Sequence, residues 1–169
     1  MKEGRVPHPI SQTVDVTATK TLVAFQPLSG YVLMRPEDND APAFLPADSV
    51  AVALGVALND ALGRSRYVPP DDRDFYDMAK HVRNHGDSER EVLRRTGGKS
   101  KREAYENAVW CRVERAEGQI RIWPHRPDKP GTWDALPEAQ CVVIPSSASE
   151  DALGNALKTA IERGRTFKG

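Results

Sequence analysis

The sequence is poor in cysteine and histidine, the two residue types that most often mark metal, disulfide or nucleophile chemistry. Its 169 residues contain two cysteines and four histidines. Cys111 and Cys141 lie in separate apolar, strand-like stretches and form no CxxC pair. We therefore expect two buried free thiols rather than a disulfide or a zinc site.

Long apolar runs and an excess of charge of either sign are also missing. No run approaches the roughly 18 apolar residues of a membrane-spanning helix, and residues 1–20 hold no apolar signal core. The 24 Lys and Arg residues balance 24 Asp and Glu residues, so the net charge points neither to nucleic acid nor to a membrane. We expect a single cytoplasmic domain spanning residues 1–169.

Signatures of catalysis and cofactor binding are absent from the sequence as well. Residues 96–100 read Thr-Gly-Gly-Lys-Ser, like the end of a phosphate-binding loop, but the first glycine of that motif is missing. His81 and His85 have the i, i+4 spacing that can present two imidazoles to zinc on a helix. Because no glutamate stands between them and no third ligand is nearby, we expect no metal, no cofactor and no enzyme activity.

What the sequence does contain is a candidate internal repeat, formed by residues 44–66 and 143–165. The matched positions are Pro46 with Pro145, Leu54-Gly55 with Leu153-Gly154, Ala57-Leu58 with Ala156-Leu157, Ala61 with Ala160, Arg64 with Arg163 and Arg66 with Arg165. In each copy the apolar residues recur at the spacing of one helix face.

The two predicted helices have capping residues at their starts and a glycine inside. Asp48 or Ser49 is a candidate N-cap of the first, and Ser147 with Glu150 fits a capping box in the second. A glycine inside a helix costs roughly 1 kcal/mol relative to alanine. Gly55 and Gly154 therefore indicate that a sheet or the other helix packs close to the backbone there.

The strand pattern repeats in the same order in both halves. Strands are predicted at residues 13–19, 21–26, 31–35 and 43–45, with Pro27 to Gly30 as a turn; a hairpin at 109–123 turns at Glu117-Gly118, and a buried strand covers 141–144. The expected fold class is α+β: two pseudo-repeated hairpin-strand-helix units forming a largely antiparallel sheet with helices packed against it. Residues 1–12 should be a loose arm.

Residues 67–106 resemble an insertion between the two halves, acidic at the start and basic at the end. Two short helices are predicted in it, near residues 75–82 and 89–95, with a break at Gly97-Gly98. The basic run 94–102, together with exposed tryptophans among Trp110, Trp123 and Trp133, would suit single-stranded nucleic acid. This is the alternative function that the residues leave open.

The acidic residues form two sets. The first is Glu37, Asp38 and Asp40, and the second is Asp71, Asp72, Asp74 and Asp77. No spacing commits any pair of them to a cleft, so acid/base catalysis is not indicated. They are either solvated loops or a negative patch that faces a basic protein.

The helix with Leu54-Gly55, its end at Arg64-Ser65-Arg66, and residues 149–157 resemble the immunity proteins of bacterial contact-dependent growth inhibition systems, the CdiI type. The resemblance covers residues 44–66 and 107–165. The resemblance implies a cytoplasmic, non-enzymatic antitoxin that forms a one-to-one complex with the C-terminal toxin domain of its cognate delivery protein, CdiA. It also implies that this toxin is a nuclease.

A nuclease presents a basic groove to nucleic acid, so an inhibitor gains association rate and specificity from acids that face the groove. We therefore expect one or both acidic sets to bind the toxin, with Phe75 or Tyr76 as an apolar anchor. The other possibility is a toxin strand that adds to an exposed edge of the sheet.

Overall fold

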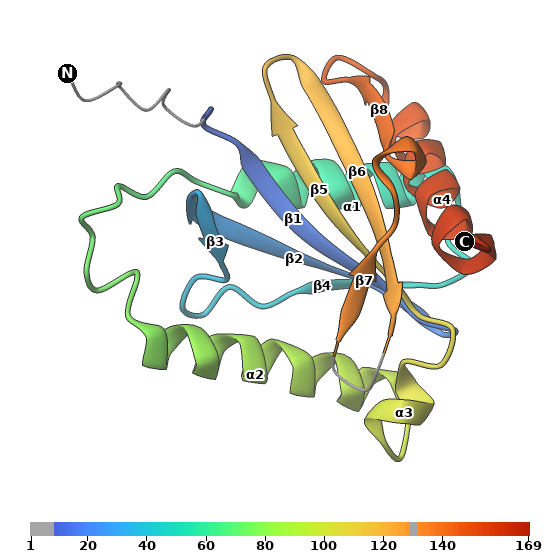
Figure 1. The fold of residues 1–169 in the computed structure, drawn as a ribbon, viewed down its shortest axis with the longest axis horizontal. Coiled ribbons are helices and arrows are strands. Elements are labelled where there is room, and N and C mark those ends of the chain that lie inside the picture. The colour runs from blue at the N-terminus through green and yellow to red at the C-terminus, as the bar shows by residue number, and fades with distance from the viewer. Residues whose placement is uncertain (1–8, 129–131) are drawn as a thin grey trace.

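The computed structural model describes residues 9–128 and 132–169, so most of the expected N-terminal arm lies outside the described residues. In this part of the chain the strands form one curved antiparallel sheet that helices cover (Figure 1). The α+β fold class predicted from the sequence is confirmed.

The first half of the chain supplies four strands, and the second half supplies four more. They are β1 (Gln12–Ala18), β2 (Leu22–Tyr31), β3 (Leu33–Arg35) and β4 (Ala43–Pro46), then β5 (Val109–Ala116), β6 (Gln119–Pro127), β7 (Trp133–Ala135) and β8 (Val142–Pro145). The order across the sheet is β3-β2-β1-β5-β6-β7, with β4 also paired to β2 and β8 also paired to β6. In each half the short strand before a helix therefore pairs with the second strand of the hairpin. This pairing is matched between the halves, while the repeat itself stays an inference from the sequence.

Two long helices follow the short strands and cover the same face of the sheet. They are α1 (Ala51–Arg64) and α4 (Glu150–Thr166). Every second side chain of β1 and β5 points at them, and Leu58 and Leu157 are fully buried in the core that results. Cys111 is buried in this core as a free thiol, and burial raises its pKa; Cys141 is half-buried and also free.

The glycines inside α1 and α4 lie where the two helices touch. A Cβ atom on Gly55 would overlap the carbonyl oxygen of Glu150, and a Cβ atom on Gly154 would overlap the carbonyl oxygen of Ala51. Each glycine therefore lets the backbone of the other helix approach. Of the two surfaces expected from the sequence, the one that packs there is the other helix.

The predicted caps of these helices are wrong. The N-cap of α1 is Val50, which makes no side-chain capping bond. Ser149, not Ser147, caps α4 by accepting a hydrogen bond from the Ala152 amide, which places Glu150 at the first helical position. The cap of α4 is thus a single Ser side chain without the reciprocal glutamate of a capping box.

Strand β2 continues through the segment predicted as a turn. Pro27 pairs with Val14 of β1, and on the other side of β2 it falls between the residues that pair with β4 and those that pair with β3. A proline, which has no backbone N–H, is tolerated at such a gap. The chain reverses instead at Val32, whose φ is 63°.

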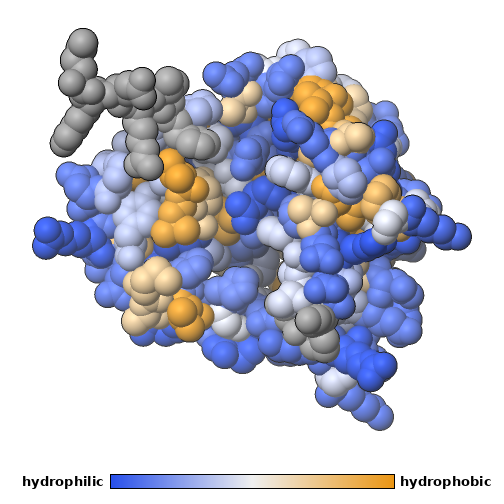
Figure 2. All heavy atoms as spheres, viewed as in Figure 1, coloured by the Kyte–Doolittle hydropathy of each residue, from blue (hydrophilic) through white to orange (hydrophobic). Residues whose placement is uncertain are grey.

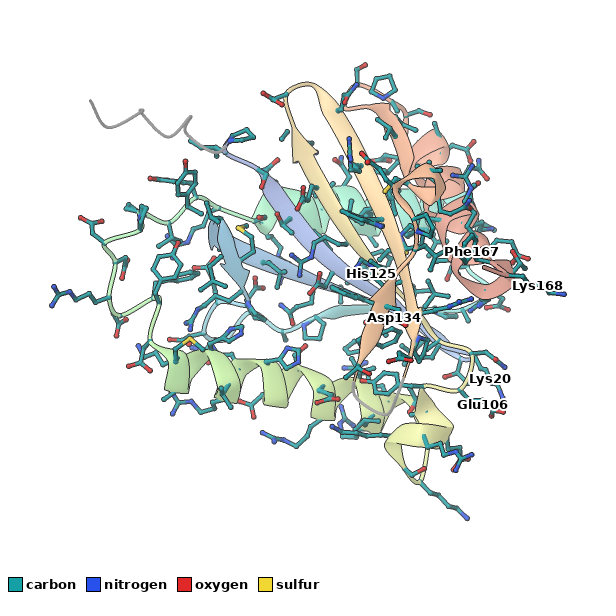
Figure 3. The ribbon with its side chains drawn as sticks, viewed as in Figure 1. Lys20, Glu106, His125, Asp134, Phe167 and Lys168 are labelled. Carbon is teal, nitrogen blue, oxygen red and sulfur yellow. The ribbon has the colours of Figure 1, made fainter. Side chains whose placement is uncertain are left out.

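The segment between the halves forms one long helix rather than two short ones. Helix α2 runs Met78–Thr96 and ends at Gly97, which has the left-handed φ of 70°, so the break predicted at Gly97-Gly98 is correct. The short α3 (Lys101–Ala104) follows. A salt bridge of 2.7 Å between Lys20 and Glu106 ties the end of this segment to the β1–β2 turn (Figure 3). Strand β7 and a short 3-10 helix (Glu138–Gln140) lie between the predicted hairpin and the last strand.

Replacement of Gly55 by alanine tests whether the α1–α4 contact requires glycine. We expect Gly55→Ala to lower the free energy of unfolding by about 1–3 kcal/mol, because the added methyl group overpacks a backbone contact. Gly63→Ala, in the same helix with nothing within 4 Å of its Cβ position, should instead raise it by up to about 1 kcal/mol. Urea denaturation measures both, and equal shifts in the two variants would contradict the proposed contact.

Candidate functional site

Helix α2 crosses the face of the sheet that α1 and α4 leave uncovered (Figure 1). Of its nineteen residues only Val92 is buried, against Leu22 and Ala24 of β2. A helix held by so little apolar contact leaves most of the opposing sheet face available, and the hollows of the surface lie beside it.

The N-terminus of α2 is fixed by a buried arginine. Arg35, only 1% exposed, donates a hydrogen bond of 3.1 Å to the carbonyl oxygen of Asp77. Its guanidinium lies 4.6 Å from the ring centre of Phe75. Tyr76 donates to the carbonyl oxygen of Val68 and accepts from the amide of Tyr31. Phe75, with 8% of its surface exposed, and Tyr76 are therefore used within the fold.

The structure brings the two predicted acidic sets together across Lys80. The ammonium of Lys80 lies 2.5 Å from Asp74 of the second set and 3.8 Å from Asp38 of the first. Asn84 donates a hydrogen bond of 2.6 Å to Asp38. This bond, together with the nearby Lys80, lowers the pKa of Asp38. The carboxylates separated in the sequence thus form one surface at the start of α2.

Several of these acids already have a cation or an amide as partner. Glu37 lies 2.5 Å from Arg66, and Asp40 pairs with Arg64. Asp72 accepts a hydrogen bond from the amide of Phe75, and Asp77 caps α2 by accepting from the amide of Lys80. Asp71 is exposed. The surface is therefore less negative than the acids alone indicate.

The first acidic set lines a groove of about 640 Å³ beside α2. Glu37, Asp38 and Asp40 form one side, and Asp87 and Glu91 of α2 form the other. Hydrogen bonds from Arg94 and Arg95 lower the pKa of Glu91 to about 2, so it is ionised in the groove. Sequence reasoning missed Asp87 and Glu91, although with Asn84 they follow the i, i+3, i+7 spacing of one helix face.

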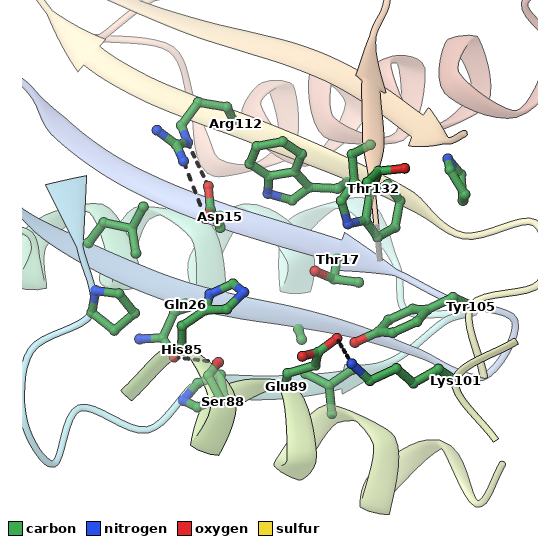
Figure 4. A pocket seen from close by; sticks show the side chains of 18 of the residues that line it. Asp15, Thr17, Gln26, His85, Ser88, Glu89, Lys101, Tyr105, Arg112 and Thr132 are labelled. Atoms are coloured by element: carbon green, nitrogen blue, oxygen red, sulfur yellow. Dashed lines mark hydrogen bonds and ion pairs between the residues drawn. The ribbon is translucent and has the colours of Figure 1, made fainter. Parts of the chain in front are cut away.

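A second hollow, of about 720 Å³, lies between α2 and the uncovered sheet face (Figures 2 and 4). We call it the sheet pocket. Its lining includes Thr17, Gln26, Trp110 and Arg112 from the sheet, Val92, His85 and Glu89 from α2, and Tyr105 and Trp133 at one end. Ser88 donates a 3.0 Å hydrogen bond to Gln26 between the pocket and the acidic groove.

The charges inside the sheet pocket are arranged as pairs. Arg112 lies 2.6 Å from Asp15, and Lys101 lies 3.0 Å from Glu89. Burial raises the pKa of Asp15, and Arg112 opposes that rise. His81 also faces the pocket; burial and the charge of Arg35 lower its pKa. Among the described residues no three His, Cys, Asp or Glu side chains are grouped as metal ligands.

The basic run and the tryptophans do not form an exposed stacking platform. Arg94 and Arg95 both pair with Glu91. Each tryptophan is half-buried: Trp110 packs 4.1 Å from the His125 ring, and Trp123 donates a hydrogen bond to the carbonyl oxygen of Leu136. Binding of single-stranded nucleic acid in the way considered above requires an exposed tryptophan beside free basic groups, and these residues do not provide that arrangement.

The fold and these surfaces define a small α+β protein with two hollows beside α2. A model of the family described as CDI immunity protein, CdiI, matches residues 12–164. The chain therefore belongs to the CDI immunity protein family, as the resemblance found in the sequence predicts. It is an immunity protein, an inhibitor rather than an enzyme.

Two solved structures share the fold over nearly the whole chain. A protein of unknown function from Neisseria meningitidis is 26% identical with a TM-score of 0.82, over 94% of this chain and 98% of that one. A chain of a CdiA-CT/CdiI toxin and immunity complex from Yersinia pseudotuberculosis is 22% identical with a TM-score of 0.81, over 91% of this chain and 97% of that one. No curated protein matches the sequence. No helix in the described part of the chain is long and apolar enough to cross a membrane.

The lowered pKa of His81 predicts that folding stability falls on acidification. Near and below pH 6.5, the ordinary value for histidine, the unfolded chain binds a proton at His81 more readily than the folded chain. The contribution of neutral His81 to the free energy of unfolding is therefore fully present above that pH and is lost as the pH falls. His81→Gln should reduce the loss of free energy of unfolding between about pH 7.5 and pH 5.5. Urea denaturation at both values provides the comparison, and an unchanged loss in the variant would refute the prediction.

Proposed function

We propose that this immunity protein binds and neutralises the C-terminal toxin domain of its cognate CdiA protein in a one-to-one complex. We further propose that the toxin is a nuclease and that the complex forms in the cytoplasm, where a nuclease reaches its substrate. The observation that carries the proposal is the family match over residues 12–164.

The acidic groove and the adjoining acidic loop, residues 71–77, support a nuclease as the partner. A nuclease binds phosphates with a basic surface, and carboxylates arranged opposite that surface raise the association rate and the specificity of an inhibitor. In the groove, Asp38, Asp87 and Glu91 come from two separate segments of the chain. Beside it lie Asp71, Asp72, Asp74 and Asp77, all exposed.

Phe75 and Tyr76 support this surface in a different way from the anchor predicted from the sequence. The Phe75 ring is covered by Arg35 and leaves little area for a partner. The Tyr76 hydroxyl is used in two hydrogen bonds within the fold. We therefore assign to both residues the role of holding the acidic loop in place, and we assign partner contact to the carboxylates.

Charge neutralisation tests the assigned surface. In the acidic-loop variant Asp71, Asp72, Asp74 and Asp77 are replaced by Asn, which retains the capping geometry of Asp72 and Asp77. We expect its Kd for the toxin domain to rise about tenfold or more at low salt, and the salt dependence of Kd to weaken. Isothermal titration with the C-terminal domain encoded by the gene immediately upstream, carrying an inactivating mutation, measures both quantities.

The matched control removes four exposed acids from the region of α1 and α4. It carries Asp48→Asn, Asp60→Asn, Asp151→Asn and Glu162→Gln, all at exposed positions. The two variants have the same net charge. A loss of affinity in the acidic-loop variant alone is therefore due to the position of the acids and not to the net charge of the protein. Equal affinities in the wild type, the variant and the control would exclude the acidic loop as the interface. An active toxin domain that degrades neither DNA nor RNA would exclude the nuclease assignment alone.

A further inference from the structure

We propose that the sheet pocket is a binding site for an uncharged aromatic group that carries hydrogen-bonding atoms. The inference concerns the chemistry of the pocket and does not depend on the toxin being a nuclease. Such a group could be a free heteroaromatic molecule or an aromatic side chain of a protein. The common chemistry is a flat, neutral ring system with a polar edge.

The volume and lining of the pocket suit a ligand of this kind. About 720 Å³ lies within the usual range for small-molecule sites, roughly 300–1,000 Å³. At one end Trp133 meets Tyr105 edge to face, with ring centres 5.9 Å apart, and lies 6.3 Å from Trp110. These rings face different directions and so offer both a face and an edge to a flat ligand.

The paired charges explain why the occupant should be neutral. Asp15 already lies against Arg112, and Glu89 already lies against Lys101, so neither pair lacks a counter-charge. The other two lining residues with full charges, Arg102 and Asp128, are exposed to solvent. A charged ligand would lose its hydration on entry without gaining an unpaired partner in the pocket.

Two hydroxyl groups supply the polar contacts. Thr17 on β1 and Tyr105 after α3 both direct their hydroxyls into the space between the sheet and α2 (Figure 4). Neither hydroxyl has a hydrogen-bond partner among the described residues. They come from two separate elements of the chain, and each can bond to a polar atom on the edge of a ring in the pocket.

Three indole compounds that share a ring and differ in charge test the inference. Indole-3-acetamide is neutral, tryptamine is a cation and indole-3-acetate is an anion near pH 7. We expect the amide to bind at least about tenfold more tightly than either charged compound, because burying an unpaired charge is costly. Protein-observed NMR of the tryptophan indole N–H resonances measures each Kd. No binding by the amide, or equal binding by a charged compound, would overturn the proposal.

Variants of the pocket locate the binding. Trp133→Leu should weaken binding of the amide about tenfold or more, since ring stacking is lost. Thr17→Val, which changes only the hydroxyl, should weaken it about two- to tenfold. Trp123→Phe is the matched control, because Trp123 is half-buried but does not line the pocket. If Trp133→Leu and Thr17→Val bind like the wild type while folded, the site is elsewhere and the proposal fails.

Addition of the inactivated toxin domain separates the two sources of the aromatic group. Displacement of indole-3-acetamide by the toxin would identify the natural occupant as a side chain of the partner. Simultaneous binding of both would identify a free molecule. Either result keeps the proposed chemistry.

Discussion

The structure depends on the close approach of α1 to α4. Because Gly55 and Gly154 have no side chain, each helix lays its backbone on the other, and both reach the same face of the sheet with their leucines. One face of the sheet therefore holds the whole main core. Among the described residues, the other face carries only the small cluster of Leu22, Ala24 and Val92, and polar or aromatic residues such as Asp15, Thr17, Trp110 and Arg112 line the sheet pocket there.

Helix α2 is held in place by a few polar bonds and one apolar contact. Arg35 holds its start and Val92 packs near its end, while Ser88 and Asn84 make hydrogen bonds between these points. Polar contacts can separate and be replaced by water or by another protein at lower cost than buried apolar contacts. The segment between the two halves is thus the part of the chain best suited to meet a partner.

The sequence predicts the elements with local signatures. Leu54 and Leu153 recur at helical spacing, and Glu117-Gly118 marks a tight turn, so the long helices and the second hairpin could be placed before the structure was known. Strand β2 was cut short because the signals of Pro27 and Gly30 are local, whereas the pairing that carries the strand past them is not. The sheet pocket could not be predicted, because Asp15 and Arg112 meet only through the pairing of β1 with β5. The acidic sets were found, but their cation partners Arg64, Arg66 and Lys80 were not.

Lys80 sits between Asp74 and Asp38 like a counterion that the protein carries with it. An unrelated basic protein would find these carboxylates already paired with Lys80. It would therefore gain little binding free energy from them. A partner whose cations match the positions of these carboxylates can take the place of Lys80 and restore each ion pair. At the proposed interface, such pairing gives little attraction to positive charge in general and favours a partner with the right spacing, which is the selectivity that an inhibitor of one toxin requires.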